Sequence, residues 1–143
     1  DGMIGAKLEE NFGSEIDGST GQHPGTDSPG AAKFADMVGG AFDATSPFTP
    51  ESYDAAALIM LAMQAAGSAE PGDYKSKVMD VANAPGEMIY PGELAKALDI
   101  LASGGEIDYV GATAVELIGP GESAGNYRQI EVSGGKISTV QYR

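Results

Sequence analysis

Residues 47–58 read Pro47-Phe48-Thr49-Pro50-Glu51-Ser52-Tyr53-Asp54-Ala55-Ala56-Ala57-Leu58, and we expect this stretch to organise the fold. A threonine hydroxyl, a proline in the first turn and an acid near the positive end of the helix dipole predict that a helix begins here. The helix should run to about Ala66 and end at Gly67. Because it is apolar nearly all round, we expect neighbouring elements to cover most of its sides. Three of its larger side chains are expected in the core, namely Tyr53, Met60 and Met63.

Further helices and strands are predicted on both sides of this helix. The spacing of apolar residues predicts helices over 3–12, 29–42, 73–82 and 92–103. Strand-like patterns occur near 16–22 and over 107–113, 127–132 and 136–142. The sequence Ser133-Gly134-Gly135 predicts a tight hairpin between the last two strands. The order of elements indicates the α/β or α+β class.

Composition excludes several classes of partner and chemistry. The chain has 143 residues, and its 8 basic and 21 acidic side chains give a formal charge of −13. This charge would repel a phosphate backbone or an anionic membrane surface, so we expect no nucleic-acid partner. The lack of cysteine excludes disulfides and thiolate zinc sites, and a single histidine excludes a multi-histidine metal site within the chain. No nucleophile, phosphate-loop or dinucleotide motif is present, so we expect no catalytic residue, no metal and no cofactor.

The chain opens on Asp1-Gly2, a pair that is typical of a turn leaving a strand and entering a helix. Since the strand itself would precede this turn, we expect a C-terminal part of a longer protein; a processed mature N-terminus is the alternative. No basic segment with an apolar core begins the chain, so no signal peptide is expected. The longest apolar run, 55–63, is shorter than the roughly 20 residues that span a bilayer.

Three segments resemble a known family when they are taken in order. They are Asp1-Gly2 with the short helix that follows, Pro47-Phe48 with the helix start from Tyr53 to Leu58, and the stretch from Gly119 to Val140 with its Gly135-Lys136. Together they are similar to the C-terminal part of type I periplasmic solute-binding proteins of the branched-chain amino-acid (Leu/Ile/Val-binding) class. The resemblance extends over nearly all of the chain but over only the last part of a full family member.

The resemblance implies the α/β class and a partial periplasmic-binding-protein type I fold, with parts of two doubly wound lobes and a closing antiparallel hairpin. It places residues 1–46 in the second lobe, 51–118 in the first, and 126–143 in the hairpin that returns to the second. Residues 47–50 and 119–125 would be the interlobe crossings. It implies a periplasmic receptor that binds an amino acid or related small polar solute in the interlobe cleft. An ABC permease in the inner membrane would be its partner.

Two residues match positions at which the family contacts its ligand. Asp1 aligns with the acid that receives the ammonium group of an amino acid, and a charge-assisted hydrogen bond suits that task. The alternative is a solvated turn aspartate. Phe48 aligns with an aromatic residue at the interlobe crossing that packs on the apolar part of the ligand. The alternative is a hydrophobic plug that holds the connector against a lobe.

The single histidine, His23, lies between Gly and Pro residues and is interpreted as an exposed loop residue. A metal site formed with Asp17 and Asp27 is the alternative, but their spacing matches no known metal motif.

Two other functions stay open. A free-standing small α/β domain or enzyme with its own pocket would use a pair of carboxylates for acid–base work. A sensor domain of the same fold would keep the architecture and change the task. If both lobes are incomplete, their sheets expose edges, and the chain could associate with a second copy of itself.

Overall fold

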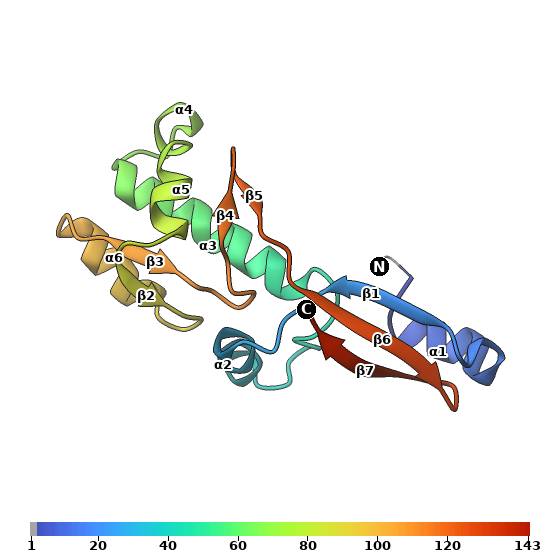
Figure 1. Cartoon of the computed structure of the whole chain (residues 1–143). Helices are drawn as coiled ribbons and strands as arrows, with labels where there is room; N and C mark the ends of the chain where they lie inside the picture. The colour runs from blue at the N-terminus through green and yellow to red at the C-terminus, as the bar shows by residue number, and fades with distance from the viewer. Residues whose placement is uncertain (1–2) are drawn as a thin grey trace.

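The structure is a computed structural model, and it describes residues 3–143. Figure 1 shows an elongated molecule in which the long helix α3 (Thr49–Ala66) runs from the middle of the molecule into one end. Helices and a parallel pair of strands gather there, in a region that we call the helical end (residues 49–109). An antiparallel sheet and one helix form the opposite region, the sheet end (residues 3–24 and 127–143).

The helical end packs around α3. Helices α4 (Pro71–Tyr74), α5 (Lys77–Ala82) and α6 (Leu94–Ala102) all contact it. Strand β2 (Glu87–Ile89) pairs in parallel with β3 (Ile107–Tyr109). The core contains side chains that are at most 1% exposed, and these are Ala57, Leu61, Ala62, Val81, Ala82, Ile89, Ala97, Ile107 and Tyr109.

The sheet end is a three-stranded antiparallel sheet in the order β1-β6-β7. Strand β1 (Thr20–Pro24) lies along β6 (Tyr127–Ser133), and β6 turns back into β7 (Lys136–Tyr142). Segments far apart in the sequence are therefore joined in one sheet. Helix α1 (Ala6–Phe12) and the 3-10 helix η1 (Gly13–Ile16) lie beside it in Figure 1.

Two carboxylates fasten the N-terminal segment to the hairpin. Asp17 accepts the backbone N–H groups of Gly134 and Gly135, at 3.0 and 2.8 Å. Glu9 accepts the Ile137 N–H at 2.8 Å and pairs with Lys136 at 2.9 Å. The hydrogen bond from Ile137, followed by that from Lys136, lowers the pKa of Glu9.

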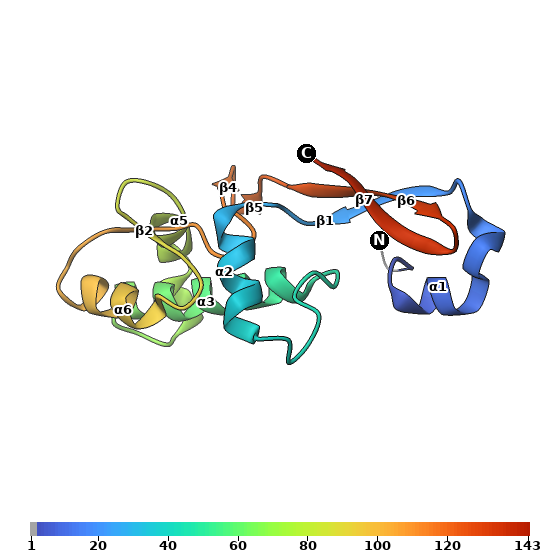
Figure 2. The ribbon, with the colours of Figure 1, turned by 90° about the horizontal axis from the view of Figure 1, so that it is seen from below.

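Helix α2 (Pro29–Val38) lies in the middle of the molecule and crosses close to the first half of α3 in Figure 2. The Ser28 hydroxyl caps its start, and its buried Phe34 packs on Tyr53 with ring centroids 5.1 Å apart. A short antiparallel ladder of β4 (Leu117–Ile118) and β5 (Glu122–Ser123) completes the fold.

The structure confirms the long helix, its end at Gly67 and the closing hairpin, and it corrects the other bounds. Helix α2 ends at Val38 because Gly39 adopts a left-handed conformation with φ 57°. The helix predicted over 73–82 begins earlier, at Pro71, and is divided into α4 and α5. Proline is favoured in a first turn, which explains the earlier start.

The strand predictions need similar corrections. Residues 13–16 form the 3-10 helix, so the first strand begins at Thr20 and not near residue 16. The strand predicted over 107–113 ends at Tyr109, because Gly111 turns the chain with φ 61°. The pattern missed β2, β4 and β5, which have two or three residues each and are too short for alternation to be visible.

The expectation that α3 is covered on most sides is wrong. Ile59 is 42% exposed and Met60 is 49% exposed, so one apolar side of the helix faces solvent. Met60 is therefore not a core residue, whereas Tyr53 and Met63 are half-buried. Among residues 3–143, no helix combines the length and the hydropathy required to cross a bilayer.

The two sides of α3 give a matched test of this packing. Replacing Leu61, which is fully buried, by alanine should lower the free energy of unfolding by about 2–5 kcal/mol. Met60→Ala on the exposed side should cost less than about 1 kcal/mol. Urea denaturation followed by circular dichroism measures both values, and equal losses would contradict the packing described here.

Candidate functional site

Asp54, in the second turn of α3, is a buried carboxylate with 3% of its surface exposed. Its Oδ1 accepts the Tyr109 hydroxyl at 2.9 Å and the Ala112 backbone N–H at 2.8 Å. Its Oδ2 accepts the backbone N–H and the hydroxyl of Thr113, at 2.8 and 2.7 Å. Four donors thus replace the water that a buried carboxylate loses.

These bonds hold the junction loop, which we define as residues 110–115. Gly111 in this loop has φ 61°, and a Cβ there would collide with Asp54 and Tyr109. The first turn of α2 approaches so closely that Gly30 has no room for a Cβ against the Gly111 carbonyl. The Asn126 side chain donates to the Thr113 carbonyl at 3.2 Å. The loop therefore joins α2, α3 and the segment that enters β6.

The Tyr109 hydroxyl acts only as a donor in this network. Burial, followed by the negative charge of Asp54, raises the pKa of Tyr109 above its ordinary value of about 10. The phenol consequently stays neutral at physiological pH and can donate to the carboxylate.

Phe48 immediately precedes α3 and has a left-handed backbone, with φ 68°. Its carbonyl accepts both the N–H and the hydroxyl of Ser52, at 2.9 and 2.6 Å. No side chain caps the start of this helix, so the predicted role of the Thr49 hydroxyl is wrong. A non-glycine residue in this conformation costs about 1–3 kcal/mol and is often found at binding sites. The aromatic ring itself is about half exposed.

Asp1, the other predicted ligand contact, lies outside the described residues. The residues that follow it line a hollow of about 430 Å³, which we call the α1 hollow. Ile4, Gly5 and Ala6 border it on one side, and Ser46 and Pro47, just before Phe48, on another. The two segments that carry the predicted contacts thus border one open space.

The α1 hollow also contains charged and polar groups from the sheet end. His23 and Arg128 line it together with Asp43. His23 is 2% exposed, and its Nδ1 lies 2.6 Å from the Pro24 carbonyl, so the interpretation as an exposed loop histidine is wrong. The histidine is buried because it belongs to β1, paired with Arg128 of β6. Asp17 is used by the hairpin turn, and residues 3–143 contain no group of three metal-ligating side chains.

A smaller cavity of about 210 Å³ lies on another side of the same junction. We call it the Glu51 cavity, because that residue of the first turn of α3 contributes its only acidic side chain. Thr113 of the junction loop and residues 123–127 complete much of its wall. A separate hollow of about 400 Å³, between α5 and the end of α6, includes neither predicted contact.

Sequence reasoning missed Asp54 and the burial of Glu51. A signal for Asp54 was present, since a lone acid within an alanine- and leucine-rich helix needs buried partners or a water-facing side. Glu51 was interpreted only as a favourable acid at the start of a helix, which describes its place in the chain but not its surroundings.

Comparison with known proteins defines the class of fold. No protein-family model matches the chain. A crystal structure of the leucine-binding protein LivK from Thermotoga maritima superposes with a TM-score of 0.64 at 15% identity, over 95% of this chain and 33% of that one. The chain therefore has the α/β fold of a fragment of a type I periplasmic binding protein.

A curated relative adds a likeness in sequence. The chemotactic signal transduction system substrate-binding protein BasB of Halobacterium salinarum is 37% identical over 73 residues, which are 50% of this chain. This chain spans only 18% of the length of that relative and a third of the length of LivK. Both matched proteins are binding proteins and not enzymes.

Asp54 offers a test of the junction. Asp54→Ala should lower the free energy of unfolding by at least about 2 kcal/mol, because the buried N–H groups of Ala112 and Thr113 would lose their acceptor. Asp43 provides a matched control, since it also accepts a backbone N–H but in an exposed loop. Asp43→Ala should cost less than about 1 kcal/mol. Denaturant unfolding measures both, and an Asp54 loss as small as that of Asp43 would show that the junction does not depend on this carboxylate.

Proposed function

We propose that the chain is the C-terminal part of an extracytoplasmic receptor that binds an amino acid or related small polar solute. The observation that carries the proposal is the superposition on a leucine-binding protein over 95% of the chain. The sequence likeness to a substrate-binding protein supports it independently. Solute-binding proteins of this fold typically act outside the cytoplasm, and we propose the periplasm as the location.

The arrangement of elements supports a division into two partial lobes. In the proposal, residues 1–46 and 126–143 belong to the second lobe, and residues 51–118 to the first. The pairing of β1 with β6 agrees with this, because it joins the beginning and the end of the chain in one sheet. Residues 47–50 and 119–125 would be the crossings.

The ligand would occupy the α1 hollow and the space beside it. Asp1 would receive the ammonium group, and Phe48 would pack on the apolar part of the solute. The exposed ring of Phe48 and its left-handed backbone support this role, since a plug that holds a connector would be expected to be buried. The neighbouring Pro47 already lines the hollow.

The proposed partner is an ABC permease in the inner membrane. A second candidate is a membrane-bound signal transducer, because the curated relative is described as part of a chemotactic signal transduction system. The receptor and its solute site are the same for both partners. Only the membrane protein that binds the liganded receptor differs. Self-association of the isolated chain is a further proposal, supported by the exposed Ile59 and Met60.

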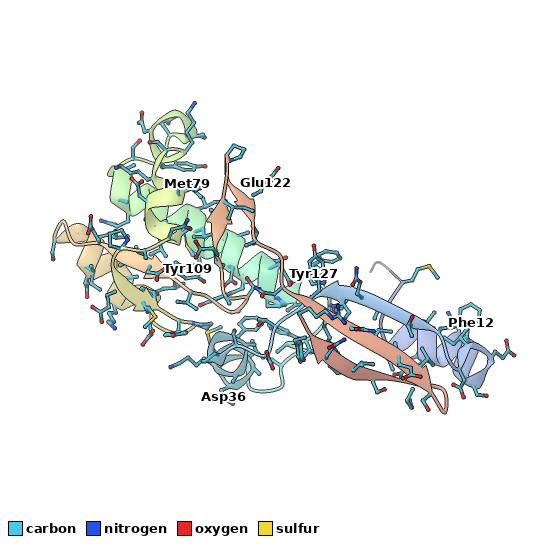
Figure 3. All side chains as sticks on the ribbon, in the orientation of Figure 1. Phe12, Asp36, Met79, Tyr109, Glu122 and Tyr127 are labelled. Carbon is cyan, nitrogen blue, oxygen red and sulfur yellow. The ribbon has the colours of Figure 1, made fainter. Side chains whose placement is uncertain are left out.

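Calorimetry on the full-length protein that carries these residues tests the function. After removal of carried-over ligand, it should bind at least one amino acid, and Phe48→Ala should weaken that binding at least about tenfold. Asp1→Asn should weaken it similarly through the lost charge-assisted bond. Phe12→Ala is the control, since this phenylalanine is equally exposed but lies at the far tip of the sheet end in Figure 3.

Two results would count against the proposal. The absence of binding across all amino acids and related polar solutes would contradict the receptor function. Unchanged affinity in Phe48→Ala, together with a lower melting temperature, would instead favour the alternative in which Phe48 is a structural plug.

A further inference from the structure

Helix α2 contacts the junction loop and the helical end with one of its faces. Gly30, Lys33 and Phe34 lie on the same side of the helix, because residues three and four positions apart are neighbours there. We call these three residues the contact face of α2. Its first residue, Gly30, approaches the Gly111 carbonyl so closely that a Cβ would clash with it. Figure 2 shows this helix crossing close to the first half of α3.

The other two residues of the contact face meet aromatic rings. The Lys33 ammonium lies 5.2 Å from the centre of the Tyr90 ring, which is a cation–π contact. Phe34 is buried, and its ring centroid lies 5.1 Å from that of Tyr53 near the start of α3. A cavity of only about 50 Å³ remains where α2 meets the junction loop. The helix is therefore packed against these elements along its whole contact face.

The partners of the contact face are held at the ends of β2 and β3. Tyr90 directly follows β2, and its N–H donates to the Glu93 side chain at 2.8 Å. The carbonyl of Ile89, the last residue of β2, accepts the Gly111 N–H at 3.1 Å. Tyr90 and Gly111 are thus fixed relative to each other, and we call them the strand-end platform. Ligands of α/β sheets bind at the carboxyl ends of parallel strands, which is where this platform lies.

The contact face and the strand-end platform belong to different lobes in the proposed division. Helix α2 lies within residues 1–46 of the second lobe, and the platform lies within residues 51–118 of the first. The contact between them is then a contact between lobes. A two-lobed receptor closes its lobes around the ligand, so such a contact stabilises the closed arrangement and is lost in an open one.

We propose that the contact face of α2 and the strand-end platform are the surfaces on which the two lobes close, so that Gly30 and Lys33 set the affinity for the solute without touching it. The inference rests on the proposed receptor function, and it adds the residues that control closure. If the solute binds only the closed form, its apparent affinity is the intrinsic affinity multiplied by the fraction of closed molecules. Gly30 permits the close approach and Lys33 stabilises it, so both act as positioning residues.

Calorimetry on the full-length protein tests both residues. Gly30→Ala should weaken solute binding at least about tenfold, because the added methyl group keeps the lobes apart. Gly72→Ala is the matched control and should leave the affinity unchanged, since this glycine also follows a proline in the first turn of a helix but has open space around it. Lys33→Met should weaken binding about two- to fivefold, as expected for an exposed cation–π contact, and Lys33→Arg should retain the wild-type affinity.

A distance measurement reads the arrangement of the lobes and needs no solute. Residues 1–143 contain no cysteine, so spin labels can be attached at Asp36→Cys on α2 and Ala95→Cys on α6, with any cysteine elsewhere in the full-length protein replaced by serine. Both positions are exposed, and Figure 3 labels Asp36. Electron–electron double resonance on the ligand-free protein should give longer distances in Gly30→Ala and in Lys33→Met than in wild type. Gly72→Ala should give the wild-type distances.

The outcomes separate this inference from the proposed function. Solute binding with unchanged affinity in both variants of the contact face, or with unchanged distances, would overturn the inference and leave the receptor function intact. If Gly30→Ala fails to fold, Lys33→Met and Lys33→Arg decide, because Lys33 is exposed. If no amino acid or related polar solute binds, the receptor function fails and the distances decide alone: longer distances in the variants support closure on this contact, and wild-type distances overturn it.

Discussion

The buried carboxylate of Asp54 is the constraint on which the rest of the structure depends. It gathers the Tyr109 hydroxyl and two consecutive backbone N–H groups of the junction loop onto the second turn of α3. That loop in turn contacts α2 through Gly30 and the segment before β6 through Asn126. Glu51 lies about one turn and Phe48 nearly two turns before this carboxylate in the chain.

The proposed function depends on this junction. The α1 hollow is bordered by the connection that precedes α3, and the Glu51 cavity by the first turn of α3 and the segment that enters β6. A solute that contacts these connections would be sensed where the two ends meet, which is what a receptor that reports occupancy by lobe closure requires. The exposed apolar side of α3 fits a chain that spans a third of the length of its structural neighbour.

Much of the fold could be predicted from local signals, and the site could be predicted only in part. The long helix and the hairpin were found because glycine and proline mark their ends. The burial of His23 and the partners of Asp54 depend on pairing between residues more than 50 positions apart, which no local pattern encodes. The short strands β2, β4 and β5 were not predicted, because two or three residues are too few to show an alternating pattern. Phe48 was proposed through a resemblance to a known family. The surroundings of Glu51 could not be predicted, because they are formed by three segments that lie far apart in the sequence.

Hydrogen exchange at the Ala112 and Thr113 amides tests the central claim most directly. Both N–H groups donate to Asp54 at 2.8 Å, so they should exchange only through global unfolding, as slowly as the amide of the buried Leu61. Thr45 is the reference for an amide that exchanges fast, since its N–H makes a hydrogen bond of the same length to Asp43 in an exposed loop. Exchange of Ala112 and Thr113 at the fast rate of Thr45 would contradict the account, because the junction would then open without unfolding the rest of the molecule.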